Sequence, residues 1–133
     1  MTIGIVGSRR RNSTEDEKAV FKAFQSVYQK GDWIVSGGCP KGADSFAEDI
    51  AQEYGITITT YYPRKEDLNL VLLKKNPRAA WAVINYARNG LIAKDADVLI
   101  ACVAPDRKGG TEDTIRRFQK FHPDAGKAHL ILV

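Results

Sequence analysis

Several features are scarce or missing in this sequence, and each absence excludes a class of protein. The 133 residues include only two cysteines, Cys39 and Cys102, and no paired cysteine and histidine spacing. This excludes a disulfide framework and gives no indication of a zinc site. No apolar run approaches the roughly 20 residues that span a bilayer, and a strand pattern begins at Thr2, too early for a signal peptide. We therefore expect a cytoplasmic protein with reduced cysteines, no metal and no membrane partner.

The composition is that of one globular domain. Hydrophobic residues make up 44% and charged residues 27% of the chain, and the net charge is +4. This length suits a single domain, residues 1–133, with a substantial core. A mildly positive charge favours anionic ligands but does not by itself indicate nucleic acid.

Short apolar runs alternate with helical patterns along the chain. The runs predict strands over residues 3–7, 33–36, 56–61, 98–103 and 128–133. Thr14 and Glu17 have the spacing of a capping box that opens the first helix, which Gly31 closes. A second helix begins at Ala43 and stops at Gly55. Strands that alternate with helices imply right-handed crossovers, so we expect an α/β fold: a single Rossmann-like three-layer domain with a five-stranded parallel sheet.

Two features between the third and fourth strands leave alternatives open. The segment from Pro63 to Pro77 mixes charges with leucines and suits either a short helix or a loop folded over the site. The helical pattern that resumes at Arg78 crosses Gly90, so it is either one bent helix or a helix whose break directs Arg88 and Asn89 at a ligand. The tryptophans and tyrosines are interpreted as core residues rather than as stacking platforms.

A glycine-rich turn joins the second strand to the second helix. It contains Gly37, Gly38 and Gly42, and Lys41 adds a mobile positive charge. Glycine leaves backbone amides uncovered, and a helix N-terminus carries unpaired N–H groups and a partial positive charge. The turn therefore predicts a site for an anionic group, most often a phosphate, with Asp44 as an acceptor for a hydroxyl.

Basic residues concentrate in the loops that follow the strands. These loops hold Arg9, Arg10, Arg11, Lys41, Arg64, Lys65, Arg107 and Lys108, against only Glu66 and Asp106. Ligands of open α/β sheets bind beyond the carboxyl ends of the strands. An anionic ligand is therefore expected at this edge, where Gly109 and Gly110 start another helix.

The motifs, taken together, resemble the SLOG superfamily. They are Val6-Gly7-Ser8-Arg9, Ser36-Gly37-Gly38 with Lys41-Gly42-Ala43-Asp44, Arg88-Asn89, and Gly109-Gly110-Thr111 with Asp113. This superfamily joins the Rossmann domain of the Smf/DNA-processing protein A proteins and the LOG enzymes to small stand-alone domains of unknown function. The chain is most similar to the stand-alone members, and the resemblance covers almost its whole length.

The resemblance implies a domain that binds a nucleotide or a nucleotide-derived ligand. Gly7, Ser8 and Arg9 would line the site from the first strand. The phosphate would be cradled by Ser36, Gly37, Gly38 and Gly42, with Asp44 near a ribose hydroxyl. Arg88 and Asn89 would reach in from a helix, and Gly110, Thr111 and Asp113 would close the site.

Three functions remain open at this stage. The first is binding of a nucleotide-derived anion, as a sensor or carrier, with no further cofactor required. The second is hydrolysis of the N-glycosidic bond of a nucleoside monophosphate, as in the LOG enzymes, with Asp44 or Asp113 as the catalytic carboxylate. Thr114 stands where those enzymes have a glutamate, which puts this chemistry in doubt. The third is binding of single-stranded DNA. Because related domains often self-associate, a homo-oligomer is also open.

Overall fold

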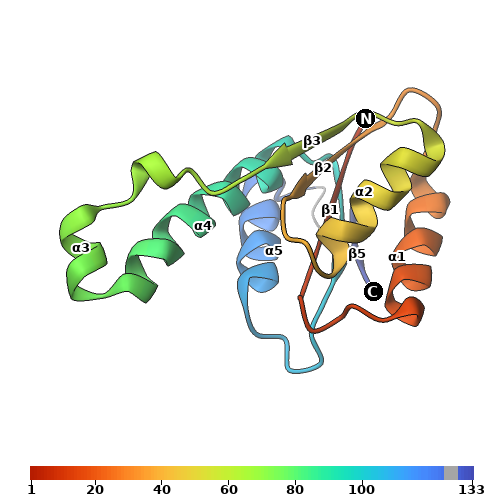
Figure 1. Cartoon of the computed structure of the whole chain (residues 1–133). Coiled ribbons are helices and arrows are strands. Elements are labelled where there is room, and N and C mark those ends of the chain that lie inside the picture. Colours follow the sequence, from red (N-terminus) through yellow and green to blue (C-terminus); the bar gives the residue numbers. More distant parts are fainter. Residues whose placement is uncertain (125–128) are drawn as a thin grey trace.

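A parallel sheet forms the centre of the protein. The computed structural model describes residues 1–124 and 129–133. Its strands pair in parallel in the order β3-β2-β1-β4-β5. They are β1 (Thr2–Gly7), β2 (Trp33–Gly37), β3 (Ile58–Tyr61), β4 (Val98–Cys102) and β5 (Leu130–Leu132). The predicted fold class, an α/β Rossmann-like fold with a five-stranded parallel sheet, is confirmed (Figure 1).

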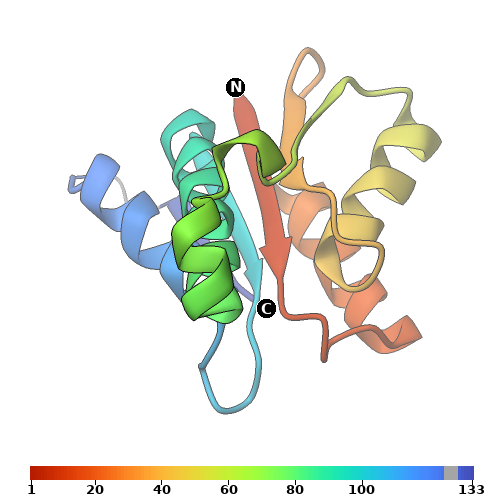
Figure 2. The same ribbon diagram turned by 60° about the vertical axis from the view of Figure 1, so that its left-hand side comes forward.

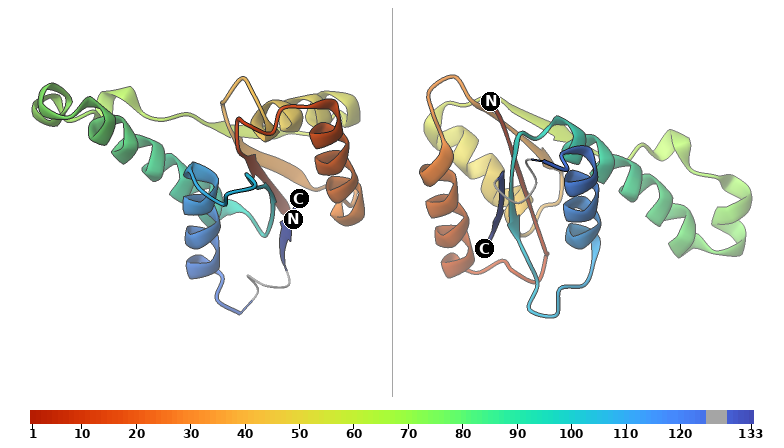
Figure 3. Two further views of the ribbon diagram at one scale, coloured as in Figure 1. Left: turned by 90° about the horizontal axis from the view of Figure 1, so that it is seen from below. Right: turned by 180° about the vertical axis from the view of Figure 1, so that it is seen from behind.

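Helices cover both faces of the sheet. Helices α1 (Thr14–Val27) and α2 (Ala43–Tyr54) lie on one face, and α4 (Pro77–Asp95) and α5 (Gly110–Phe121) lie on the other (Figures 2 and 3). The chain builds β1, β2 and β3 outward and then returns to place β4 beside β1. Because crossovers keep one hand, this reversal moves the helices to the opposite face. The carboxyl ends of β1 and β4 therefore form the switch point of the sheet.

Two hydrophobic clusters hold the layers together. Successive side chains of a strand point to opposite faces, so Ile3 and Ile5 of β1 pack with Phe24 under α1 and α2. Val6 instead packs with Phe118 under α4 and α5. Burial on both faces explains why the strands are continuous apolar runs.

Several boundaries differ from the predicted ones. The N-cap of α1 is Ser13, one residue earlier than predicted, and its partner in the capping box is Asp16. Asp16 takes this role while also binding the guanidinium of Arg11, at 2.8 Å. Helix α1 ends at Val27, well before Gly31, whereas Gly55 caps α2 with φ 65° as predicted.

The third, fourth and fifth strands are shorter than predicted, and β4 ends at Cys102 rather than at residue 103. β3 begins at Ile58 rather than at residue 56, and β5 spans Leu130–Leu132. The predicted first residue of the fifth strand, Ala128, lies outside the described residues.

The segment between β3 and α4, together with the first half of α4, forms an arm. It contains the short helices η1 (Lys65–Asp67) and α3 (Leu70–Lys75), and α3 packs against the first half of α4, away from the sheet (Figure 1). We call residues 63–87 the arm. Of the two alternatives for Pro63 to Pro77, the structure shows a short helix and not a loop over the site. Helix α4 continues through Gly90 without a break.

No helix in the described part of the chain has the length and apolar character needed to cross a membrane.

Candidate functional site

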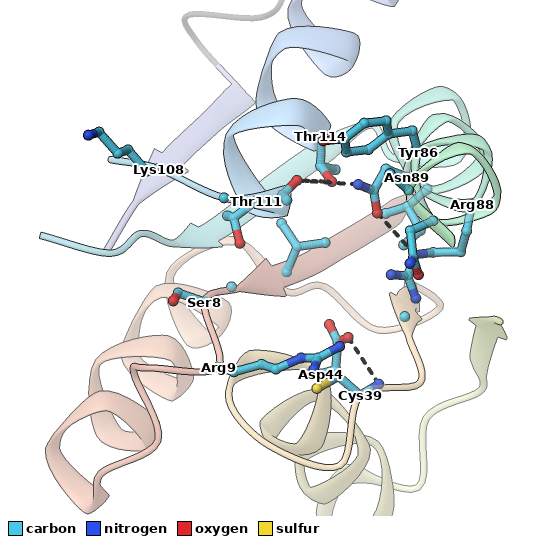
Figure 4. Close-up of a pocket in the computed structure, with 18 of the residues that line it drawn as sticks. Ser8, Arg9, Cys39, Asp44, Tyr86, Arg88, Asn89, Lys108, Thr111 and Thr114 are labelled. Carbon is cyan, nitrogen blue, oxygen red and sulfur yellow. Dashed lines mark hydrogen bonds between the residues drawn. The ribbon is translucent and has the colours of Figure 1, made fainter. Parts of the chain in front are cut away.

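A cavity of about 560 Å³ opens at the switch point of the sheet (Figure 4). Its floor is the end of β1 and the loop that follows, and its walls are α4 and the start of α5. The volume lies within the range of about 300–1,000 Å³ usual for small-molecule sites. Both its position and its size are those of a ligand site in an open α/β sheet.

The structure brings most of the predicted site residues together around this cavity. Those that line it are Gly7, Ser8, Arg9, Gly37, Asp44, Arg88, Asn89, Gly109, Gly110 and Thr111. The others, Ser36, Gly38, Lys41, Gly42 and Asp113, are not among its lining residues.

The glycine turn between β2 and α2 differs most from its predicted role. The buried Asp44 carboxylate accepts the backbone N–H of Cys39 at 3.2 Å and the hydroxyl of Ser36 at 3.0 Å. The N–H of Gly42 donates to Asn12 Oδ1 at 2.8 Å. These donors, which were expected to cradle a phosphate, are thus bonded to side chains of the protein itself. Asp44 supplies the negative charge that the turn was expected to take from a ligand.

Packing accounts for two glycines of the turn. A Cβ on Gly38 would lie 1.8 Å from the ring of Tyr62. Gly42 has φ +77°, and a Cβ there would lie 2.7 Å from the carbonyl oxygen of Ser8. The first glycine therefore admits an aromatic ring, and the second lets the loop after β1 cover the start of α2. Lys41 is exposed outside the cavity.

Asp44 and Arg88 face each other across Gly37. A Cβ on Gly37 would lie 2.7 Å from both Asp44 Oδ2 and Arg88 Nη1, so glycine here lets the two groups approach. Burial raises the pKa of Asp44, and the Cys39 amide, Ser36 and Arg88 only partly oppose this rise. Burial also lowers the pKa of the Arg88 guanidinium, a shift that Asp44 opposes.

Arg9 places a second guanidinium in the cavity. Its side chain extends from the loop after β1 toward Asp44 and Cys39 (Figure 4). It acts on Arg88 as a like charge and lowers the pKa of that group further. Within residues 1–124 and 129–133, the Arg9 side chain makes no hydrogen bond or ion pair with another residue. Its donors are available to a ligand.

The charges around the cavity are mostly positive. The lining cations are Arg9, Arg10, Arg78, Arg88 and Lys108, whereas Asp44 is the single carboxylate among the described lining residues. Arg10 is neutralised by Asp106, at 2.7 Å. The remaining surplus favours an anionic ligand.

The start of α5 contributes backbone donors to the same cavity. The N-cap is Gly109, with φ 117°, and no side chain caps the helix. Gly110 and Thr111 of the first turn line the cavity. The first N–H groups of a helix lack intrahelical partners and carry a partial positive charge. The anion position that the sequence placed at α2 is therefore better provided at α5.

Asn89 connects α4 to α5. Its buried amide donates to the Gly110 carbonyl and to Asp113 Oδ2, both at 3.3 Å. Asp113 is also paired with Arg117, at 2.9 Å. Asp113 thus holds two helices together instead of facing the cavity. The Thr114 side chain does line the cavity, and its hydroxyl donates to the Gly110 carbonyl at 3.3 Å.

Several basic residues that were predicted at this edge are neutralised nearby. Arg107 pairs with Glu112 at 2.9 Å, and Arg64 pairs with Glu66 and Asp67, each at 3.2 Å. The Arg11 guanidinium binds Asp16 and donates to the carbonyl oxygens of residues 103 and 133. Most of these acidic partners lie in the first turns of helices and not in the loops that directly follow the strands.

The arm side of the cavity was not predicted from the sequence. This wall is formed by Arg78, Trp81, Ala82, Asn85 and Tyr86 of α4. Trp81 is 39% exposed, so its interpretation as a core residue is wrong. The same interpretation is wrong for four other exposed aromatic residues, Trp33, Tyr54, Tyr62 and Tyr86. Helical spacing was the available signal, because steps of three and four residues back from Asn89 reach all of these positions.

The two cysteines lie in different surroundings. Cys102 is buried in the core, as predicted, and Cys39 is partly exposed at the cavity. Over the described ranges, no group of three or more histidine, cysteine, aspartate or glutamate side chains is placed to hold a metal ion.

Comparison of the chain with protein-family models, with curated proteins and with solved structures gave no match. The resemblance to the SLOG superfamily therefore stays a prediction from the sequence motifs.

Proposed function

We propose that this protein binds a nucleotide or nucleotide-derived anion in the cavity at the switch point of the sheet. The observation that carries the proposal is the pair of guanidiniums, Arg9 and Arg88, beside one buried carboxylate. Asp44 offsets one of these two like charges, and an anionic ligand close to both guanidiniums would offset the other. The SLOG-like motifs support a nucleotide as the source of that anion.

The cavity offers complementary groups to each part of such a ligand. A phosphate is served by the Arg9 guanidinium and by the N–H groups at Gly110 and Thr111. Charge-assisted hydrogen bonds to phosphate are roughly twice as strong as neutral ones. Asp44, the carboxylate that lines the cavity, would accept a hydroxyl of the sugar.

Calorimetry with AMP and NAD tests the proposal through two matched variants. Arg9 and Lys41 are both exposed cations of loops at this edge, but Arg9 lines the cavity and Lys41 does not. Loss of a charged hydrogen bond of about 1.5–3 kcal/mol makes binding about 10- to 150-fold weaker in Arg9→Ala. Lys41→Ala should bind as the wild type does. Equal affinity of Arg9→Ala and wild type, or no binding by the wild type, would contradict the proposal.

Asp44 supports a second candidate function, hydrolysis of an N-glycosidic bond. It is a buried carboxylate with a raised pKa in a cavity, the environment of many catalytic acids. Against this, the position of the LOG glutamate is occupied by Thr114, whose hydroxyl is bonded to the backbone. Incubation with nucleoside monophosphates, followed by chromatography for free base, tests this candidate. Base release that disappears in Asp44→Asn would establish turnover, and no release by the wild type leaves binding alone.

A further inference from the structure

The cavity continues from the sheet edge along α4 into the arm, and two aromatic side chains of this helix line it. Tyr86 lies near Asn89 and the start of α5 (Figure 4), and Trp81 lies farther along, in the arm. Trp81 is 39% and Tyr86 44% exposed, and both are lining residues. Exposed aromatic rings beside a cationic cavity are the groups on which nucleobases stack. This wall is chemically distinct from the backbone donors at the start of α5 and from the Arg9 guanidinium beside Asp44.

The two rings flank a narrow strip of small and polar groups. Trp81 and Tyr86 are five residues apart, which places them about 140° apart around the helix axis. Ala82 and Asn85 lie between them and also line the cavity. The small side chain of Ala82 leaves room for a flat group against either ring.

Asn85 is held in a defined orientation within this strip. Its side-chain N–H donates to the backbone carbonyl of Trp81 at 2.9 Å. In the part of the chain that the structure describes, the side-chain oxygen of Asn85 accepts no hydrogen bond. That oxygen is an acceptor for an N–H or amino group on the edge of a base.

The distance between the two ends of the cavity suits a mononucleotide. Trp81 precedes Asn89 by eight residues, a rise of about 12 Å along the helix. Asn89 contacts Gly110 at the start of α5, where the phosphate is proposed to bind. A phosphate at that end therefore leaves the sugar near Asp44 and the base within reach of the arm.

We infer that Trp81 and Tyr86 form a nucleobase subsite, so that the ligand is a nucleotide with its base stacked on the arm rather than a sugar phosphate or a free phosphate. This inference rests on the proposed function. It adds which end of the ligand the arm recognises and which residues do so.

The two tryptophans allow a direct test. Trp33 lies at the start of β2 and does not line the cavity, so Trp33→Phe leaves Trp81 as the single tryptophan, whose emission can be excited selectively over that of the tyrosines. In this variant, AMP should quench the Trp81 fluorescence. Ribose 5-phosphate should compete with AMP without quenching by itself, because it has no base to stack.

Affinity measurements complete the test. Trp81→Ala should weaken AMP by between about 5- and 150-fold, corresponding to about 1–3 kcal/mol for a stacked base. The same variant should bind ribose 5-phosphate within about twofold of the wild type, and Trp81→Phe should restore most of the AMP affinity. Val83→Ala is the matched control, since Val83 is exposed on the same helix but does not line the cavity. Circular dichroism of each variant verifies that it is folded.

Each alternative outcome has a separate meaning. Failure of both AMP and ribose 5-phosphate to bind would overturn the proposed function itself. Binding of both with equal affinity, unchanged in Trp81→Ala, would overturn only the nucleobase subsite. A change of sedimentation coefficient in Trp81→Ala, with AMP affinity unaltered, would show that the aromatic face contacts a second copy instead. Quenching by a dT oligomer but not by AMP, with a steep dependence on salt, would assign the face to single-stranded DNA.

Discussion

Replacement of Asp44 by asparagine tests how the buried carboxylate affects the folded state. Asp44 is 8% exposed and accepts hydrogen bonds from the Ser36 hydroxyl and the Cys39 N–H. The asparagine oxygen can still accept the N–H of Cys39. Its amide group can donate to Ser36 Oγ, which leaves the one hydroxyl hydrogen of Ser36 to the Ile5 carbonyl at 2.6 Å. The substitution therefore removes the charge and keeps the hydrogen bonds.

The sign of the pH effect follows from the pKa shift. Burial raises the pKa of Asp44 above its unfolded value of about 3.9. The folded state thus holds the proton more strongly than the unfolded chain does. The stability that this provides is fully present below the unfolded pKa and is lost as pH rises through the folded pKa. Each unit of upward shift corresponds to about 1.4 kcal/mol lost by neutral pH.

Urea unfolding of wild type and Asp44→Asn, followed by circular dichroism from pH 3.5 to 8, measures this effect. The free energy of unfolding of Asp44→Asn should improve relative to wild type as pH rises, and then level off. Asp32→Asn is a control of opposite sign. Burial raises the pKa of Asp32, but the N-terminal ammonium at 2.8 Å and the Gln29 N–H together lower it below its ordinary value. Its stability relative to wild type should fall as pH rises. A decline of Asp44→Asn relative to wild type with rising pH would refute the reasoning about the buried carboxyl.

Two further predictions concern the fold. Phe118 is fully buried, so Phe118→Ala should lower the free energy of unfolding by about 3–5 kcal/mol. Phe121 is 49% exposed on the same helix, so Phe121→Ala should lower it by about 0.5 kcal/mol or less. Similar urea midpoints for the two variants would contradict the assignment of Phe118 to the core. Gly55→Ala should lower the free energy of unfolding by about 1 kcal/mol through backbone strain alone, because Gly55 has φ +65° and a Cβ there would have nothing within 4 Å. Gly42→Ala adds a clash with the Ser8 carbonyl and should cost at least about 1 kcal/mol more in the same assay.

Local patterns in the sequence were sufficient for the fold and for the edge of the sheet at which the cavity lies. Continuous apolar runs such as 98–103 require burial on both faces, and that condition alone predicts a parallel sheet with helices on each side. Once the sheet is parallel, the loops that follow its strands must meet at one edge. The grouping of Ser8, Gly37 and Gly110 at one cavity follows from this, whereas that of Arg88, which lies within α4, does not.

The state of each polar group depends on partners that only the tertiary structure brings together. In the glycine turn, Asn12 accepts the N–H of Gly42 and Asp44 accepts the N–H of Cys39. The ring of Tyr62 fills the space that Gly38 leaves. Exposure of Trp81 depends on where the arm projects, and helical periodicity alone does not contain that direction. The sequence by itself determined the edge of the sheet at which the cavity would form. Only the tertiary structure decided which donors are free in it, because hydrogen bonds and ion pairs between distant segments consume the rest.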